Sequence, residues 1–386
     1  MTPPAAAASL RAHPLVGAAA RLGVFVAIAA AGWATAAALD VHDLGDTGAY
    51  LHVVTSLLAI GLVASVRGID LVEARRHVTV VVTAVTVGVL LKALLITAVM
   101  YAFFREPAFL VLGIAVAQID PLSFAALSSS GDTSPRVRTL LAAWSAFDDP
   151  ITVLLTVYLA GTLATGPAGA SLPDLSSFGT GLLHNAAFII VAYLLWRLTR
   201  IAGAGGRVRT IVQTLLLGAL MAYAVWQLLM LGLAVSALFF RPDIGRLLDR
   251  LATAAFNVAT FALGLLLAAG VAMRAGIVLG AAAFGAQIVV GSLVAVRFSG
   301  PDRRAVALGQ QSGITAVLLA LLLEKPFPGS VAVVAPAIVI VNVLHALANN
   351  LRSRPAPAAQ PGASDAKSES TSVRTLPDSP PSSSCP

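Results

Sequence analysis

The stretch Leu140-Leu141-Ala142-Ala143-Trp144-Ser145-Ala146-Phe147-Asp148-Asp149-Pro150-Ile151-Thr152-Val153-Leu154-Leu155 places two adjacent carboxylates and a proline inside an apolar segment long enough to cross a membrane. A carboxylate at the bilayer centre costs about 2.5–3.5 kcal/mol even on lenient insertion scales. A membrane protein keeps such a pair where it faces an internal cavity and has a function there. We therefore interpret Asp148 and Asp149 as candidates for carrying protons or cations across the membrane.

The composition of the whole chain is that of a polytopic all-α membrane protein. Of its 386 residues, 58% are hydrophobic and only 11% are charged, whereas soluble domains carry about 25% charged residues. The formal net charge is +7, but the basic residues are scattered through short loops. That distribution indicates control of membrane topology and argues against a nucleic-acid partner. The single cysteine, Cys385, excludes an internal disulfide.

Hydropathy predicts about twelve transmembrane helices, because windows of about 20 apolar residues can cross the ~30 Å hydrocarbon core. The predicted spans are 20–39, 50–66, 79–103, 107–128, 137–162, 178–200, 209–224, 226–240, 252–272, 275–296, 304–323 and 330–351. The seventh and eighth form one stretch, Thr210 to Phe240, that is too long for one span and short for two. Hydropathy alone therefore leaves a count of eleven open.

The distribution of positive charge favours twelve spans with both termini in the cytoplasm of a cell-membrane protein. With that orientation the outside loops hold only Arg105, Arg274 and Lys325. The inside segments hold Arg11, Arg21, Arg67, Arg75, Arg76, Arg136, Arg138, Arg197, Arg200, Arg207, Arg209, Arg241, Arg246, Arg250, Arg297, Arg303, Arg304, Arg352 and Arg354. This strong positive-inside bias requires that Thr210 to Phe240 crosses twice.

The sequence also predicts a division into segments. Residues 1–14 and 353–386 are rich in Pro, Ala and Ser and are expected to be disordered tails flanking a transmembrane domain over 15–352. Spans 3–5 and 10–12 are an odd number of spans apart and so run in opposite directions. The middle span of each set is interrupted by a polar cluster, which is typical of inverted repeats with discontinuous helices at a transporter's midplane site.

The first interrupted span contains Gln118-Ile119-Asp120-Pro121. Proline lacks an N–H and clashes with the preceding turn, so the helix is expected to open there. The freed carbonyl groups then need water, a cation or a protein partner, since lipid offers none. The alternative is a kinked helix in which Asp120 is satisfied by a neighbour and has no part in transport.

The adjacent acids are expected to reach one cavity, because successive helical residues point about 100° apart. Burial and a like-charged neighbour both disfavour the ionised carboxylate, so the pair is suited to exchanging a proton for a cation. Carboxylate oxygens suit Na⁺ or Li⁺. A buried protonated pair used only for helix packing is the alternative reading.

Lys92 is the one lysine within any predicted span, and it lies thirteen and eleven residues from the two ends of 79–103. That depth makes it hard for the ammonium group to reach the interface. We predict that Lys92 pairs with one of the aspartates; a lysine facing a water-filled crevice is the alternative. Other polar residues within spans are expected to make ordinary helix-to-helix hydrogen bonds. They are His184, Asn185, Asn257, Gln287, Ser292, Asn342 and His345.

The segment from Ala115 to Pro150 resembles the monovalent cation:proton antiporter superfamily. Gln118-Ile119-Asp120-Pro121 is similar to the family's Thr-Asp-Pro element, Arg136-Val137-Arg138-Thr139-Leu140-Leu141 to its linker, and Asp148-Asp149-Pro150 to its ion-binding acids. The second half matches only through the pattern of Gly309 to Gly313.

The resemblance implies an NhaA-like fold with crossed discontinuous helices in spans 4 and 11, assembled as a homodimer. It implies a core of spans 79–162 and 275–351, moving against a dimerisation scaffold of spans 20–66 and 178–272. By position, Asp149 would alternately bind H⁺ and the cation, and Asp120 would sit where the broken helices cross. Asp148 stands where electroneutral relatives have Asn, which implies electrogenic exchange. Ser145 and the cluster Gln310-Gln311-Ser312 would support the site.

The sequence departs from the family pattern at two positions and lacks a basic residue in the Gln310–Ser312 cluster. Ile119 stands where the family has Thr, which removes a hydroxyl ligand. The family's span-10 lysine, which pairs with the first acid, is matched best by Ser292. We hypothesise that Lys92 supplies the missing counter-charge.

The function expected from these features is exchange of a monovalent cation for protons by alternating access, without a cofactor. Na⁺ is the cation expected before any other. The partners are the lipid bilayer, the cation and protons. The alternative is a Na⁺-coupled symporter of a small organic anion, which the polar Gln310-Gln311-Ser312 cluster would suit. An enzyme is not expected, because the sequence contains no nucleophile motif, metal-ligand cluster or Gly-rich phosphate loop.

Overall fold

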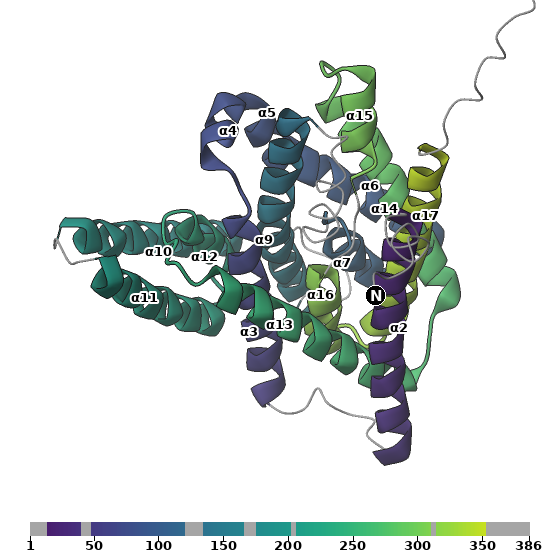
Figure 1. Cartoon of the computed structure of the whole chain (residues 1–386). Coiled ribbons are helices and arrows are strands. Elements are labelled where there is room, and N and C mark those ends of the chain that lie inside the picture. The colour runs from purple at the N-terminus through teal and green to yellow at the C-terminus, as the bar shows by residue number, and fades with distance from the viewer. Residues whose placement is uncertain are drawn as a thin grey trace, which may run out of the picture.

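The computed structural model describes residues 14–39, 48–119, 134–165, 175–201, 206–309 and 314–352. Every regular element in these ranges is a helix, as predicted (Figure 1). The first half contains α2 (Pro14–Leu39), α3 (Gly48–Arg67), α4 (Leu71–Arg76), α5 (Val78–Thr83), the π-helix η1 (Ala84–Gly88), α6 (Val89–Phe104), α7 (Pro107–Ala115) and α9 (Pro135–Thr165). The second half contains α10 (Leu175–Ile201), α11 (Gly206–Gln227), α12 (Met230–Ala237), α13 (Gly245–Leu266), the 3-10 helix η2 (Leu267–Ala269), α14 (Met273–Val294), α15 (Gly300–Ala307), α16 (Ile314–Glu324) and α17 (Ser330–Arg352).

Nine helices of the described chain are long and apolar enough to cross a membrane. Each agrees with a predicted span to within a few residues. Their exposed side chains are largely apolar, as lipid-facing surfaces require. The chain is therefore a multi-pass membrane protein, and the count of twelve stays a prediction.

The apolar stretch from Thr210 to Phe240 contains two helices, α11 and α12. The chain breaks at Leu228, whose φ is 57°, and α12 follows with eight residues. Eight helical residues extend about 12 Å, well short of the ~30 Å hydrocarbon core. The stretch therefore divides as predicted, but α12 alone is too short to make the eighth crossing.

The interruptions predicted for the fourth and eleventh spans coincide with helix ends. Helix α7 stops at Ala115, before Gln118. Helix α15 stops at Ala307, and α16 begins at Ile314. The polar residues between these ends, Asp120-Pro121 and Gln310-Gln311-Ser312, lie outside the described residues, as do the tail 353–386 and all but the last residue of 1–14. The predicted crossing of the two interrupted spans is therefore untested.

Helices of the predicted core contact one another closely. Helix α9 touches α6 and α7, α14 packs on α17 and α6, and the short helices α7 and α16 meet in the interior (Figure 1). Helix α9 is the most enclosed of the nine spans: 67% of its apolar window is buried, against 17% for α11. Any ionisable group on the inner face of α9 is consequently shielded from both lipid and bulk water.

Helices of the predicted scaffold form the rest of the molecule. Helix α13 packs on α2 and α3, and α10 and α11 lie side by side and project together to one side (Figure 1). The main contacts between the two groups run from α3 to α9 and α16, from α12 to α9, and from α13 to α16. The division into a moving core and a fixed scaffold stays a prediction.

Glycines allow the closest helix crossings. A Cβ on Gly264 of α13 would overlap the backbone carbonyl of Ala29 on α2, and a Cβ on Gly32 would overlap that of Phe261. On the other side, Gly276 of α14 leaves room for the ring of Pro336 in α17. These contacts agree with the use of small residues to pack membrane helices.

We predict that Gly264→Val separates α2 from α13 and lowers the thermal unfolding midpoint of the detergent-purified protein. The backbone of Ala29 cannot move aside as a flexible side chain can. The loss in free energy of unfolding should therefore reach the about 1–3 kcal/mol that is typical of overpacking. Gly218→Val on α11 is the control, because a Cβ there meets nothing within 4 Å. Equal midpoints for the two variants would contradict the close crossing.

Candidate ion-binding site

Helix α9 carries both acids into the interior. Asp148 is 0% exposed and Asp149 is 2% exposed. The helix continues through Pro150 without a break, and the hydroxyl of Thr152 donates to the backbone carbonyls of Asp148 and Asp149, at 2.9 Å each. Pro150 has no N–H to donate to the carbonyl of Ala146, so the helix lacks one backbone hydrogen bond beside the acids.

Asp148 forms a buried ion pair with Lys92 of α6. The distance from Lys92 Nζ to Asp148 Oδ2 is 2.6 Å, and both side chains are 0% exposed. The predicted contact between Lys92 and one of the aspartates is therefore present. Replacing one partner of a buried pair costs far more than a surface salt bridge is worth, because the other charge is left without compensation.

A short π-helix precedes Lys92. Residues 84–88 form η1, and Gly88 lies against the indole ring of Trp144, so that a Cβ there would come within 2.9 Å of it. The Lys92 ammonium group lies 5.3 Å from the centre of the same ring. A π-turn changes the direction in which the following side chains point, and such turns are frequent at functional sites. Trp144 thus lines the place where Lys92 meets Asp148.

Two further groups surround the pair. The backbone N–H of Ile119, just beyond the end of α7, donates to Asp148 Oδ2 at 3.1 Å. Gln287 of α14 accepts from Lys92 at the longer distance of 3.5 Å and donates through Nε2 to the carbonyl of Val306, at 3.1 Å. The interrupted span therefore supplies a free backbone donor to the carboxylate, as a continuous helix could not.

Asp149 is contacted by the other interrupted span. The hydroxyl of Thr315, in the first turn of α16, donates to Asp149 Oδ2 at 2.8 Å. Neighbouring carboxylates on one helix are thus held by different elements: Asp148 by α6 and the chain after α7, Asp149 by α16. Among the buried residues that the structure describes, the ionisable side chains of this region are Lys92, Asp148 and Asp149.

The structure brings only some of the predicted site residues together. Ile119 contributes its backbone amide, while its side chain is buried in an apolar cluster. Ser145 is buried, but its hydroxyl donates to the carbonyl of Ala142 in its own helix, at 3.1 Å. Asp120, Pro121, Gln310, Gln311 and Ser312 lie outside the described residues.

Ser292, the position matched to the family's span-10 lysine, is not the residue of α14 that bonds to Lys92. The residue of α14 that reaches Lys92 is Gln287. Ser292 is five residues further on, where its carbonyl accepts from Arg303. The match relied on neighbouring residue types, whereas the face of the helix decides which side chain reaches the acids.

Thr315 is a residue of the site that the sequence did not single out. Thr315 follows Gly313 at the start of the returning helix, and the position of a hydroxyl after a polar break is a signal that could have found it. Asn185, by contrast, makes the predicted interhelical hydrogen bond, since its Oδ1 accepts from the N–H of Gly232 at 2.7 Å.

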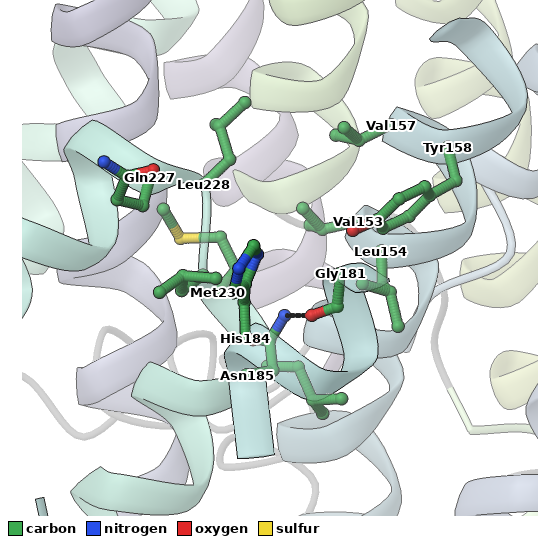
Figure 2. A pocket seen from close by; sticks show the side chains of 12 residues that line it. Val153, Leu154, Val157, Tyr158, Gly181, His184, Asn185, Gln227, Leu228 and Met230 are labelled. Atoms are coloured by element: carbon green, nitrogen blue, oxygen red, sulfur yellow. Dashed lines mark hydrogen bonds between the residues drawn. The ribbon is translucent and has the colours of Figure 1, made fainter. Parts of the chain in front are cut away.

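A separate pocket lies between α9, α10 and α12. It has a volume of about 210 Å³ and is lined by Val153 and Tyr158 of α9, His184 of α10, and Gln227 and Met230 at the α11–α12 break (Figure 2). Val153 follows Asp149 by one helical turn, but neither acid lines the pocket. The pocket therefore belongs to the boundary between the predicted core and scaffold.

No cluster of three or more His, Cys, Asp or Glu side chains able to hold a metal ion occurs in the described part of the chain. A resident transition metal or Ca²⁺ would need such a cluster. A transported Na⁺ would not, because carboxylate, carbonyl and hydroxyl oxygens suffice for it. The predicted Na⁺ site at Asp148 and Asp149 stays a prediction.

Comparison of the sequence with protein-family models and with curated proteins found no match. Solved structures match the fold, among them two of the sodium proton antiporter MjNhaP1 from Methanocaldococcus jannaschii. The structure at pH 8 matches with a TM-score of 0.55 and 18% identity, over 86% of this chain and 99% of that one. An electron-microscopy structure matches with a TM-score of 0.56 and 18% identity, over 78% and 84%. The chain therefore shares its fold with MjNhaP1.

We predict that Lys92→Ala destabilises the protein by about 3–5 kcal/mol, because Asp148 would be left buried and uncompensated. Adding Asp148→Asn should recover a large part of that loss. Denaturant unfolding of the two single variants and the double variant in detergent gives the coupling free energy. Additive effects would contradict the ion pair.

Proposed function

We propose that this chain is a secondary transporter that exchanges a monovalent cation, Na⁺ first, for protons, with both ions competing for Asp148 and Asp149. The observation that carries this proposal is the pair of fully buried carboxylates facing a single lysine, within a fold shared with a sodium/proton antiporter. A structural membrane protein gains nothing from this arrangement that apolar residues would not provide more cheaply.

The charge balance of the site supports competition for one position. Lys92 contributes one positive charge and the two aspartates two negative charges, so the ionised cluster carries one negative charge in excess. A net charge in a low-dielectric interior is strongly unfavourable. One proton or one Na⁺ removes it, and the two ions cannot occupy the same carboxylate oxygens together.

The two acids then have different roles. Asp148 is stabilised by Lys92 and the Ile119 amide, so it is the acid with a built-in counter-charge. Asp149 accepts a hydrogen bond from the Thr315 hydroxyl of the other interrupted span. By its place in the family pattern, Asp149 is the acid that alternately takes a proton and the cation, while Lys92 acts as the counter-charge that the pattern places on span 10.

Transport by alternating access requires that the site is exposed to one side at a time. We propose that the core helices α6, α7, α9 and α14 to α17 move against α2, α3 and α10 to α13. The contacts between these groups are fewer than within them, and a pocket lies along their boundary. The exposed apolar faces of α10 and α11 would be available for a homodimer.

The site should respond to pH in one direction. As the pH falls, protons occupy the carboxylate more of the time and the apparent affinity for Na⁺ falls. Exchange therefore weakens on the acidic side by competition, without any separate sensor. Raising the Na⁺ concentration should restore the rate.

We predict that Asp149→Asn reduces exchange to the level of empty vesicles. The amide has a similar shape but can neither release a proton nor supply the charge that the cation needs. Proton flux in reconstituted vesicles, with NaCl, LiCl or KCl added in turn, measures the effect, and circular dichroism checks that the variant is folded. Undiminished exchange by folded Asp149→Asn would contradict the proposal.

We further propose that both termini lie in the cytoplasm of a cell-membrane protein, from the excess of arginine in the corresponding segments. A fluorescent reporter fused after Pro386 should then be active and a periplasmic phosphatase reporter inactive. Fusions after Lys325, in a predicted outside loop, are the control and should give the opposite result. Phosphatase activity at the C-terminus would overturn this topology.

A further inference from the structure

Gln118 is a buried amide whose side chain has no hydrogen-bond partner. The residue is 1% exposed, and neither its Oε1 nor its Nε2 makes a hydrogen bond. Leaving an amide without partners in an apolar interior costs about 1–3 kcal/mol by mutational measures. Other buried amides of the chain are bonded: Asn185 through both side-chain atoms, and Gln287 to the carbonyl of Val306. The exception therefore calls for a physical explanation.

Gln118 is next in the chain to the residue whose backbone contacts the carboxylate pair. Its neighbour Ile119 donates its backbone N–H to Asp148 Oδ2, so the Gln118 side chain branches from the chain one residue away from that contact. Helix α7, which leads into Gln118, contacts both α9 and α16. Those two helices carry Asp149 and Thr315.

A second oxygen at the same place is also without a partner. Asp148 Oδ2 accepts from Lys92 and Ile119, but Asp148 Oδ1 is buried and accepts no hydrogen bond. Hard cations bind carboxylate, carbonyl and hydroxyl oxygens. Discontinuous membrane helices supply such oxygens where their chains are unwound.

We propose that Gln118 is a ligand of the transported cation, through its side-chain carbonyl oxygen. The ligand set comprises Gln118 Oε1, Asp148 Oδ1, the Asp149 carboxylate and the Thr315 hydroxyl, whose oxygen can accept when its hydrogen rotates away. The Gln118 amide oxygen thereby replaces, as a cation ligand, the threonine hydroxyl that the family has at the position of Ile119. This assignment rests on the proposed exchange function and names one more residue of its site.

The proposal separates the two competing ions. A proton binds one carboxylate oxygen and needs no further ligand, whereas Na⁺ needs several oxygens around it. Gln118 therefore favours the cation over the proton without changing the acids themselves. Removing its oxygen should weaken Na⁺ binding and leave the proton-carrying chemistry in place.

The test uses the full-length protein with Gln118→Met, which keeps the length of the side chain and removes the amide. Gln213→Met is the matched control, because the Gln213 amide donates to Thr199 between α11 and α10, in the predicted scaffold. Thermal unfolding in detergent is followed as NaCl replaces choline chloride at constant ionic strength. The Michaelis constant for Na⁺ is measured in vesicles.

We expect Gln118→Met to unfold in choline chloride at the wild-type temperature or above, since an unpartnered buried amide has been removed. The Na⁺ concentration that gives half of the stabilisation should rise about tenfold or more, as should the Michaelis constant, as expected for losing one bond to a charged group. Gln213→Met should change neither Na⁺-dependent quantity. If Gln118→Met does not fold, Gln118→Asn withdraws the amide by one methylene and should raise both quantities by a smaller factor.

Unchanged Na⁺ dependence in the folded Gln118 variant, alongside loss of exchange in Asp149→Asn, would overturn the assignment and leave the proposed function standing. The failure of the function itself has a different signature. In that case the wild-type protein shows no Na⁺-driven proton flux and no Na⁺-dependent stabilisation, and the Asp149→Asn variant gives the same flux and stability as the wild type.

Discussion

The structure depends on an ion pair of Lys92 and Asp148 enclosed beside a second carboxylate, Asp149. A buried charge is tolerated only where another charge or a set of oriented dipoles compensates it. Lys92 and the Ile119 amide provide that compensation for Asp148, and Thr315 donates a hydrogen bond to Asp149.

The interrupted helices around the acids supply hydrogen-bond donors that uninterrupted helices cannot. In the middle of a span, every backbone amide is used within its own helix, so none is available to a carboxylate. The chain after α7 releases the Ile119 amide to Asp148, and the start of α16 brings Thr315 to Asp149. Helix α9 is the common element, and its enclosure by both interrupted spans keeps lipid and bulk water away from the acids.

Much of the fold was predictable because hydropathy follows directly from the cost of exposing polar groups to lipid. The nine long helices, the breaks near Gln118 and Gly309 and the burial of both acids are all of this kind. The partner of Lys92 was predictable because a lone lysine deep in a span needs an anion. The division of Thr210 to Phe240 was predicted from charge, but the exact break at Leu228 and the shortness of α12 were not, since the stretch is mostly apolar and contains no proline.

The order of residues alone determines the membrane class, the helical spans and the identity of the charged residues. Each of these is a property of a short segment and its solvent. The assignment of partners is a different matter. Thr315 meets Asp149 across 166 residues, and Gln287 rather than Ser292 faces Lys92. Such pairings depend on the rotation of each helix about its axis and on which helices are neighbours, and packing of the whole chain settles both.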